Sequence, residues 1–176
     1  MLKEYLTYLH ESIPTKFRKK VEVFIKYQEN KLIVGINDRW GKPMLMLPGG
    51  GIEKGESLEK TAEKECLEEL GIKIKNPKLM SKKTMKVDWY EAKKRGVNLP
   101  QKSQDRMLIY RGTEIYFMKA EFEKVDMRYY GKDKDQMKPK IVTIDQMKKD
   151  FKQRSSTGDY VFRKMALFRV NLLDQL

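Results

Sequence analysis

The chain has 176 residues, 40% hydrophobic and 10% aromatic, which is enough apolar content to bury a core and excludes wholesale disorder. Lysine and arginine total 38 against 25 acidic residues, and the resulting formal charge of +13 attracts polyanions such as nucleotides and RNA. Acidic residues are interspersed along most of the chain, so surface lysine spread for solubility explains this charge equally well. No run approaches the ~20 apolar residues of a membrane-spanning helix. The single cysteine and the lack of a signal-peptide pattern lead us to expect a cytoplasmic protein with no membrane partner.

The first part of the chain predicts a short helix followed by three strands. Apolar residues recur at helical spacing within residues 1–12. Residues 21–27 and 31–36 are β-rich runs, and the short connection between them predicts a hairpin. Residues 44–47 predict a third strand, which the run Pro-Gly-Gly-Gly ends.

The rest of the sheet is predicted from four later segments, at residues 72–79, 83–89, 107–122 and 140–144. Residues 91–105 are mostly polar and contain a proline, so we expect them to form a loop or insertion.

Three more helices are expected. Ser57 can cap a central helix, and Gly71 suits the left-handed position just past its end. Asp145 can cap a short helix, and a terminal helix with an apolar stripe spans about residues 159–173. Strands before and after a central helix predict an α+β fold, an α/β/α sandwich with a mixed β-sheet between helices. We expect residues 1–176 to form a single domain, with the N-terminal and C-terminal helices as additions.

The segment from Gly50 to Ile72 carries the chemistry. Glu65, Glu68 and Glu69 stand at i, i+3 and i+4, so their carboxylates share one face of the central helix. Like charges at this spacing weaken a helix unless a cation lies among them. Oxygen ligands favour hard cations, above all Mg²⁺, with Mn²⁺ as a substitute. The glycines before the helix let the backbone approach the same ion or a phosphate.

The alternative interpretation is a solvated acidic face balanced by Lys60 and Lys64, which does not account for the glycines. Cys66 falls on the apolar side of the same helix and should pack as a small hydrophobic residue. The only histidine, His10, lies in the N-terminal helix, so a histidine-ligated zinc site is excluded.

This segment resembles the Nudix box, whose fixed positions are matched by Gly50, Glu56, Glu65, Glu68, Glu69 and Gly71. Lys64 stands where the family usually has an arginine that orients the glutamates, and lysine keeps the charge but loses the bidentate fork. The resemblance implies the Nudix fold and a hydrolase acting on phosphorus-containing acid anhydrides. In that family a metal-activated water attacks a pyrophosphate bridge.

The resemblance also implies roles for single residues. Glu65 and Glu69 would be the principal Mg²⁺ ligands together with the Gly50 carbonyl, and Glu68 a ligand or the general base. Glu56 would brace the loop or bind a metal through water.

One further acidic residue is expected from the loop before the last strand, because several members of the family draw one from there. Asp133 and Asp135 lie in such a loop, and Asp135 is the preferred candidate.

The implied substrate is a nucleoside diphosphate linked to another group: a dinucleoside polyphosphate, a nucleoside triphosphate or an RNA 5′ end. Trp40, Trp89 and Tyr90 are candidates for stacking on a base, although each could equally be a packing residue. The alternative function is a non-catalytic Nudix domain that binds nucleotide or RNA. The retention of every box glutamate favours the enzyme.

Overall fold

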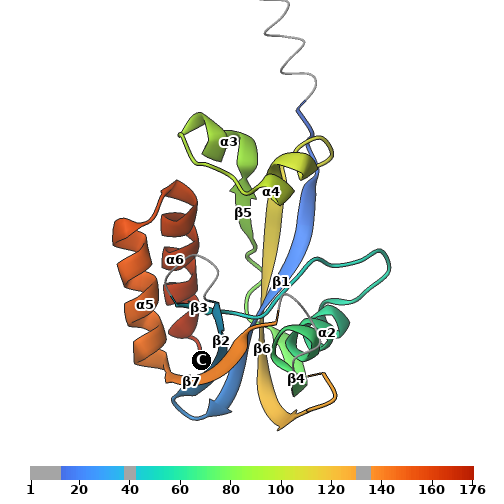
Figure 1. Ribbon diagram of the computed structural model, residues 1–176, viewed down its shortest axis with the longest axis vertical. Coiled ribbons are helices and arrows are strands. Elements are labelled where there is room, and N and C mark those ends of the chain that lie inside the picture. Colours follow the sequence, from blue (N-terminus) through green and yellow to red (C-terminus); the bar gives the residue numbers. More distant parts are fainter. Residues whose placement is uncertain (1–12, 38–42, 130–135) are drawn as a thin grey trace, which may run out of the picture.

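Figure 1 shows the computed structural model, which describes residues 13–37, 43–129 and 136–176. The helix predicted for residues 1–12 lies outside these ranges. The described strands are β1 (Phe17–Gln28), β2 (Lys31–Asn37), β3 (Met44–Met46), β4 (Ile72–Leu79), β5 (Met85–Asp88), β6 (Gly112–Val125) and β7 (Lys138–Thr143). The described helices are α2 (Leu58–Leu70), α3 (Trp89–Lys94), α4 (Gln101–Arg106), α5 (Ile144–Thr157) and α6 (Tyr160–Leu173).

The described strands form one seven-stranded mixed sheet. Its main path runs β3-β2-β1-β6-β4, while β7 pairs with β2 and β5 pairs with β6. β1 and β6 are parallel, with Phe17 opposite Gly112 at one end and Lys26 opposite Glu121 at the other. All other pairs are antiparallel, and β1 with β2 confirms the predicted hairpin.

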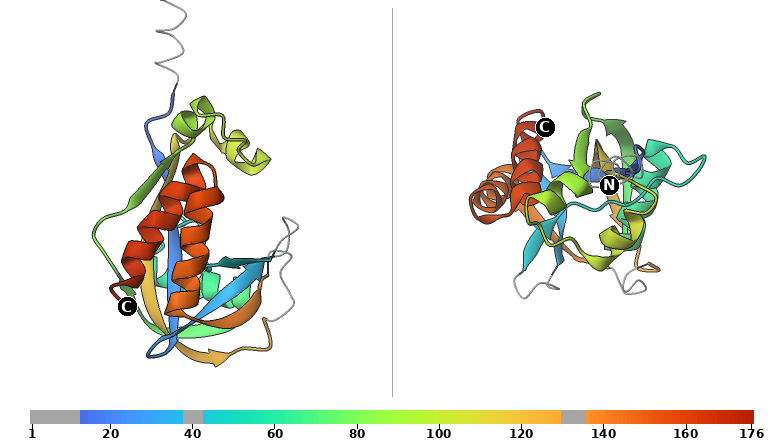
Figure 2. Two further views of the ribbon diagram at one scale, coloured as in Figure 1. Left: turned by 90° about the vertical axis from the view of Figure 1, so that its left-hand side faces the viewer. Right: turned by 90° about the horizontal axis from the view of Figure 1, so that it is seen from above.

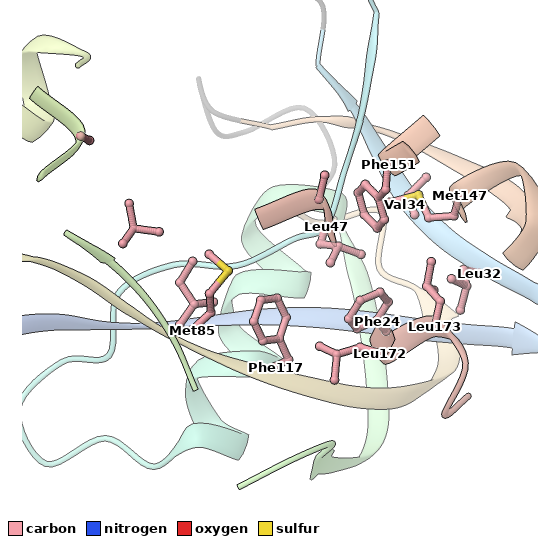
Figure 3. Close-up of a cluster of buried hydrophobic side chains, with 14 of the residues drawn as sticks. Phe24, Leu32, Val34, Leu47, Met85, Phe117, Met147, Phe151, Leu172 and Leu173 are labelled. Atoms are coloured by element: carbon pink, nitrogen blue, oxygen red, sulfur yellow. The ribbon is translucent and has the colours of Figure 1, made fainter. Parts of the chain in front are cut away.

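Helices cover both faces of this sheet, which confirms the predicted α/β/α sandwich (Figures 1 and 2). Alternate residues of β1 point to opposite faces. Val21, Val23 and Ile25 pack with the apolar side of α2. Phe24 packs on the other face with α5 and α6, and its ring centroid lies 6.3 Å from that of Phe117 (Figure 3).

Helix α2 begins and ends where the sequence predicts. The Ser57 side chain accepts a hydrogen bond from the Lys60 N–H at 3.2 Å. Gly71 follows the last turn with φ 65°, a backbone conformation in which a Cβ is strained. Cys66 is fully buried, and burial raises the pKa of its thiol well above the ordinary value, so it packs as predicted.

The segment between β5 and β6 differs from the prediction of a loop. Residues 91–105 contain most of α3 and α4, and Trp89 starts a helix rather than ending a strand. The Asp88 carboxylate caps α3 by accepting the Glu91 N–H at 3.0 Å. Each helix has six residues, too few for an apolar stripe to repeat visibly in the sequence.

The strand predicted within residues 107–122 is confirmed as β6, which begins at Gly112. The N–H groups of Ile109 and Tyr110 turn back onto the Arg106 carbonyl, at 3.0 and 2.9 Å, so this stretch closes a turn instead of pairing. Residues 107–111 therefore precede the strand, and β6 continues to Val125.

The cap predicted for the next helix is also wrong. Thr143, not Asp145, caps α5, because its hydroxyl accepts the Gln146 N–H while the Gln146 side chain accepts the Thr143 N–H. Ile144 is thus helical, and α5 is longer than the short helix expected. The terminal helix is confirmed as α6, capped by Asp159. None of the described helices is both long and apolar enough to cross a membrane.

A buried ion pair joins the last helix to the first strand. Glu22 is 2% exposed and Arg169 is 6% exposed. The Arg169 Nη2 lies 2.8 and 2.7 Å from the Glu22 Oε1 and Oε2, and Nε lies 3.0 Å from Oε2. Burial alone would raise the pKa of Glu22, but Arg169 and then Lys20 hold it below its ordinary value. Since both ions have left bulk water, each depends on the other.

Removal of one partner of this pair should therefore destabilise the protein strongly. Arg169→Met should lower the free energy of unfolding by about 3 kcal/mol, because Glu22 is left charged and buried. Replacing both residues with methionine should recover most of the loss. The measurement is denaturant unfolding.

Arg163→Met on the exposed side of α6 is the matched control and should change stability by less than about 1 kcal/mol. Equal losses from the two single substitutions would show that the buried pair has no special importance.

Candidate active site

A short glycine loop, residues 48–52, runs antiparallel along β1. The Val23 N–H donates to the Pro48 carbonyl at 2.9 Å, and the Val21 N–H donates to the Gly50 carbonyl at 2.9 Å. A Cβ at Gly49 would overlap the carbonyl oxygen of Val21. Only glycine at position 49 allows the loop to lie this close to β1.

The carboxylate of Glu69 reaches this loop from α2. Its Oε2 accepts the Gly49 N–H at 2.7 Å, which fixes the side chain against the backbone. Burial raises the pKa of Glu69 to about 7, although the bond from Gly49 and the charge of Lys20 oppose the shift. The carboxylates of Glu65 and Glu22 add to it. Burial thus makes the ionised form of Glu69 less favourable than it would be in water.

Glu65 lies one turn before Glu69 on α2 and contacts Gly50, the next residue of the loop. A Cβ at Gly50 would overlap the carboxylate of Glu65, so the two are in direct contact. Burial and then the charge of Glu68 raise the pKa of Glu65 as well. The structure therefore brings Glu65 and Glu69 together at the Gly49–Gly50 backbone, with Glu68 close enough to repel Glu65.

Lys20 is a charged neighbour of this pair that sequence reasoning missed. Its Nζ lies 3.4 Å from the Glu22 Oε1, and its charge lowers the pKa of both Glu65 and Glu69. Lys20 and Glu22 are two residues apart on β1, so their side chains lie on the same face of the strand. The sequence shows that Lys20 and Glu22 share a face, but it does not show that the glycine loop lies beside Lys20.

Glu56 and Lys64 hold the connection between loop and helix. The Glu56 Oε2 accepts a hydrogen bond from the Thr61 hydroxyl at 2.8 Å, and this bond is the main reason that its pKa is lowered. The Lys64 Nζ lies 2.8 Å from the Glu53 Oε1. Lys64 is thus paired with a residue of the connecting loop, a partner that the sequence did not suggest.

The two aromatic candidates that the structure describes, Trp89 and Tyr90, belong to or pack against the core cluster that includes Phe24 and Phe117. Trp89 is 6% exposed, so its ring contributes packing to the core. The Tyr90 hydroxyl donates to the Met107 carbonyl at 2.6 Å, and its ring packs against the same core. Trp40 and Asp135 lie outside the described residues.

The donors at the loop fit a divalent cation that keeps part of its water shell. Within residues 13–37, 43–129 and 136–176, no three acidic, histidine or cysteine side chains converge closely enough to enclose a metal alone. Glu65 and Glu69 do converge on one loop, where the Gly50 carbonyl uses one of its two lone pairs for Val21. Mg²⁺ commonly binds one or two carboxylates and takes its other ligands from water and substrate phosphate.

Comparison with known proteins identifies the fold and the family. A family model described as the NUDIX domain matches residues 16–155. A Nudix hydrolase from Nitrosomonas europaea is 18% identical, with a TM-score of 0.54 over 77% of this chain and 78% of that chain. An ADP compounds hydrolase is 15% identical, with a TM-score of 0.56 over 92% of this chain and 75% of that chain. A MutT mutator protein from Bacillus halodurans is 20% identical, with a TM-score of 0.52 over 76% and 72%.

The contact between Gly50 and Glu65 predicts that the effects of substitutions at these two positions on stability are not additive. Gly50→Ala should lower the free energy of unfolding by up to about 1 kcal/mol, because the new methyl overlaps the Glu65 carboxylate and this flexible side chain must move. In a Glu65→Ala background the carboxylate is gone, and the same substitution should cost much less. Thermal unfolding of the four proteins measures this coupling independently of activity. An equal cost in both backgrounds would refute the contact.

Proposed function

The chain belongs to the NUDIX domain family. We propose that it hydrolyses pyrophosphate bonds of nucleoside diphosphate derivatives with Mg²⁺ bound at the glycine loop. The observation that carries this proposal is the convergence of the Glu65 and Glu69 carboxylates on the Gly49–Gly50 backbone. Two carboxylates with raised pKa values, in contact with one backbone segment, are stabilised in their ionised form by a cation.

Glu65, Glu69 and the Gly50 carbonyl are the proposed ligands of the cation, with Mn²⁺ as a substitute for Mg²⁺. Glu68 is a further ligand or the general base that accepts a proton from the attacking water. A divalent cation supplies charge neutralisation of the phosphates and lowers the pKa of a coordinated water.

The other residues of the site act on these carboxylates. The Gly49 N–H fixes the direction of one Glu69 oxygen, which leaves the other free to bind. Glu56 braces the start of α2 through Thr61, and Lys64 holds the loop through Glu53. Lys64 therefore orients the glutamates indirectly, by fixing the loop that precedes them.

Asp135 is kept as a proposed additional acid. Met137, two residues later, donates its N–H to the Glu69 carbonyl at 2.8 Å. The chain on the C-terminal side of Asp135 is thus anchored to the residue that bears the proposed ligand.

The proposed substrates are a nucleoside triphosphate, a dinucleoside polyphosphate or an RNA 5′ end, and the proposed compartment is the cytoplasm. Tyr90, which is half-buried, remains a candidate for substrate contact. The experiment that identifies the substrate is a screen of these compounds with Mg²⁺, in which mass spectrometry of the products locates the cleaved bond.

Hydrolysis should depend on a divalent cation. A chelator should abolish turnover of the best substrate, and Mg²⁺ or Mn²⁺ should restore it, because the donors are all oxygen. The measurement is product formation before and after metal addition. Activity that persists after complete metal removal would overturn the assignment.

Glu69→Gln should lower turnover at saturating Mg²⁺ at least about a hundredfold, on the order of 3 kcal/mol of activation free energy. The amide keeps the size of the side chain but loses the charge that binds the cation. Glu63→Gln is the matched control on the same helix, since Glu63 is exposed and makes no contact with the glycine loop among the described interactions. Turnover of Glu69→Gln equal to that of Glu63→Gln would contradict the role of Glu69.

A further inference from the structure

Helix α5 carries a buried arginine that reaches the strand before the glycine loop. The side chain of Arg154 is 13% exposed. Its Nη2 donates a hydrogen bond at 2.6 Å to the carbonyl of Leu45, the central residue of β3, although the two residues lie 109 positions apart in the sequence. This bond therefore ties the C-terminal part of the chain to the strand that leads into the glycine loop.

Strand β3 is the element that this bond supports. It has three residues and lies at one end of the main strand path, where it pairs with β2. A strand this short makes few ladder hydrogen bonds, and a backbone carbonyl that leaves water needs a donor. A bond from a packed helix to the central carbonyl of β3 is thus a large part of what fixes the strand.

The guanidinium that makes this bond is itself held in place. Nη2 lies 2.5 Å from the Asp150 Oδ2, one turn earlier on α5, and this oxygen accepts no hydrogen bond from the described residues. Asp150 therefore holds the charge of Arg154 and leaves the N–H for the strand. The Arg154 Cζ lies 5.7 Å from the centroid of the Phe151 ring, and the Arg169 Cζ lies 5.4 Å from the same centroid. Since Arg169 is paired with Glu22, Arg154 is part of a packed arrangement rather than a free surface cation.

The connection from Leu45 to the proposed metal site is short. Three residues separate Leu45 from Gly49. Of these, Leu47 is 6% exposed and packs in the core cluster that also contains residues of α5 (Figure 3). The Gly49 N–H donates to Glu69 at 2.7 Å. A shift of β3 is therefore carried within a few residues to the bond that fixes the Glu69 carboxylate.

We propose that Arg154 is a positioning residue for hydrolysis. Through the Leu45 carbonyl it holds β3, and thereby the glycine loop, in the place where the carboxylates of Glu65 and Glu69 meet it. The loop is then fixed from both faces of the sheet, by glutamates of α2 on one side and by an arginine of α5 on the other. This inference rests on the proposed function, because it takes the loop to be part of the metal site.

The first measurement follows the loop without metal or substrate. Amide hydrogen exchange, detected by NMR, reports on the Gly49 N–H, bonded to Glu69, and on the Val23 N–H, bonded to the Pro48 carbonyl. In Arg154→Met both should exchange at least about tenfold faster, while amides between β4 and β6 keep their wild-type rates. Arg154→Lys can still donate to the strand carbonyl and should recover part of the protection.

The second measurement concerns metal binding and turnover. Arg154→Met should raise the Kd of Mn²⁺, measured by electron paramagnetic resonance, about tenfold and lower kcat by a similar factor or more. KM at saturating Mn²⁺ should stay within about twofold, because the substrate contacts are unchanged.

Lys148→Met is the matched control on α5. Lys148 forms an ion pair with Asp174 at 2.7 Å, so the control removes a paired cation from the same helix. Loop exchange, Mn²⁺ binding and turnover should all keep their wild-type values in this variant.

The outcomes separate positioning from simple stabilisation. Equal acceleration of exchange in the loop and between β4 and β6 would mean that Arg154 only stabilises the fold, and unchanged exchange at Gly49 and Val23 would also overturn the proposal. If Arg154→Met does not fold, Arg154→Lys and Asp150→Asn give the same comparison, since each weakens the hold on β3 and keeps a donor. Failure of the proposed function is distinguishable, because the wild-type protein would then neither bind Mn²⁺ nor hydrolyse nucleotides, whatever the exchange rates of the variants.

Discussion

The close approach of the glycine loop to both β1 and α2 is the constraint on which the site depends. On one side the loop accepts backbone hydrogen bonds from β1, and on the other it receives the side chains of two glutamates. A Cβ at Gly49 would overlap the strand, and one at Gly50 would overlap Glu65. Gly49 therefore lets the loop lie against β1, and the carboxylates of Glu65 and Glu69 meet the loop from α2. Burial in this geometry raises the pKa of Glu69 to about 7.

The terminal helix is linked to the same place through the core. Arg169 of α6 lies outside residues 16–155, which match the family model, yet it neutralises Glu22 in the middle of β1. Glu22 also contacts Lys20 and adds to the negative charge felt by Glu69. An added helix thus influences the electrostatics of the site from the opposite end of the chain. That residues 1–176 form a single domain remains a prediction.

The sequence was sufficient for features that depend on local patterns. The alternating strands, the Ser57 and Gly71 caps and the spacing of the three glutamates predicted β1, β2 and α2 correctly. It was insufficient where tertiary contacts decide: α3 and α4 are too short to show periodicity, and Thr143 competes with Asp145 for the cap of α5. Lys20 gains its importance only from the glycine loop that lies beside it. The sequence left open whether Trp89 stacks on a base or packs, and its burial in the core favours packing.

The central claim, that a divalent cation binds where α2 meets the glycine loop, is tested most directly by locating the cation. Crystals grown with Mn²⁺ and a non-hydrolysable nucleotide would be measured for anomalous scattering at the manganese edge. The account predicts a peak within coordination distance of the Glu65 and Glu69 carboxylates and the Gly50 carbonyl, about 2.0–2.4 Å for a hard cation with oxygen ligands. A peak held only by other acidic residues, with Glu69 still bonded to Gly49 and without a metal contact, would contradict it.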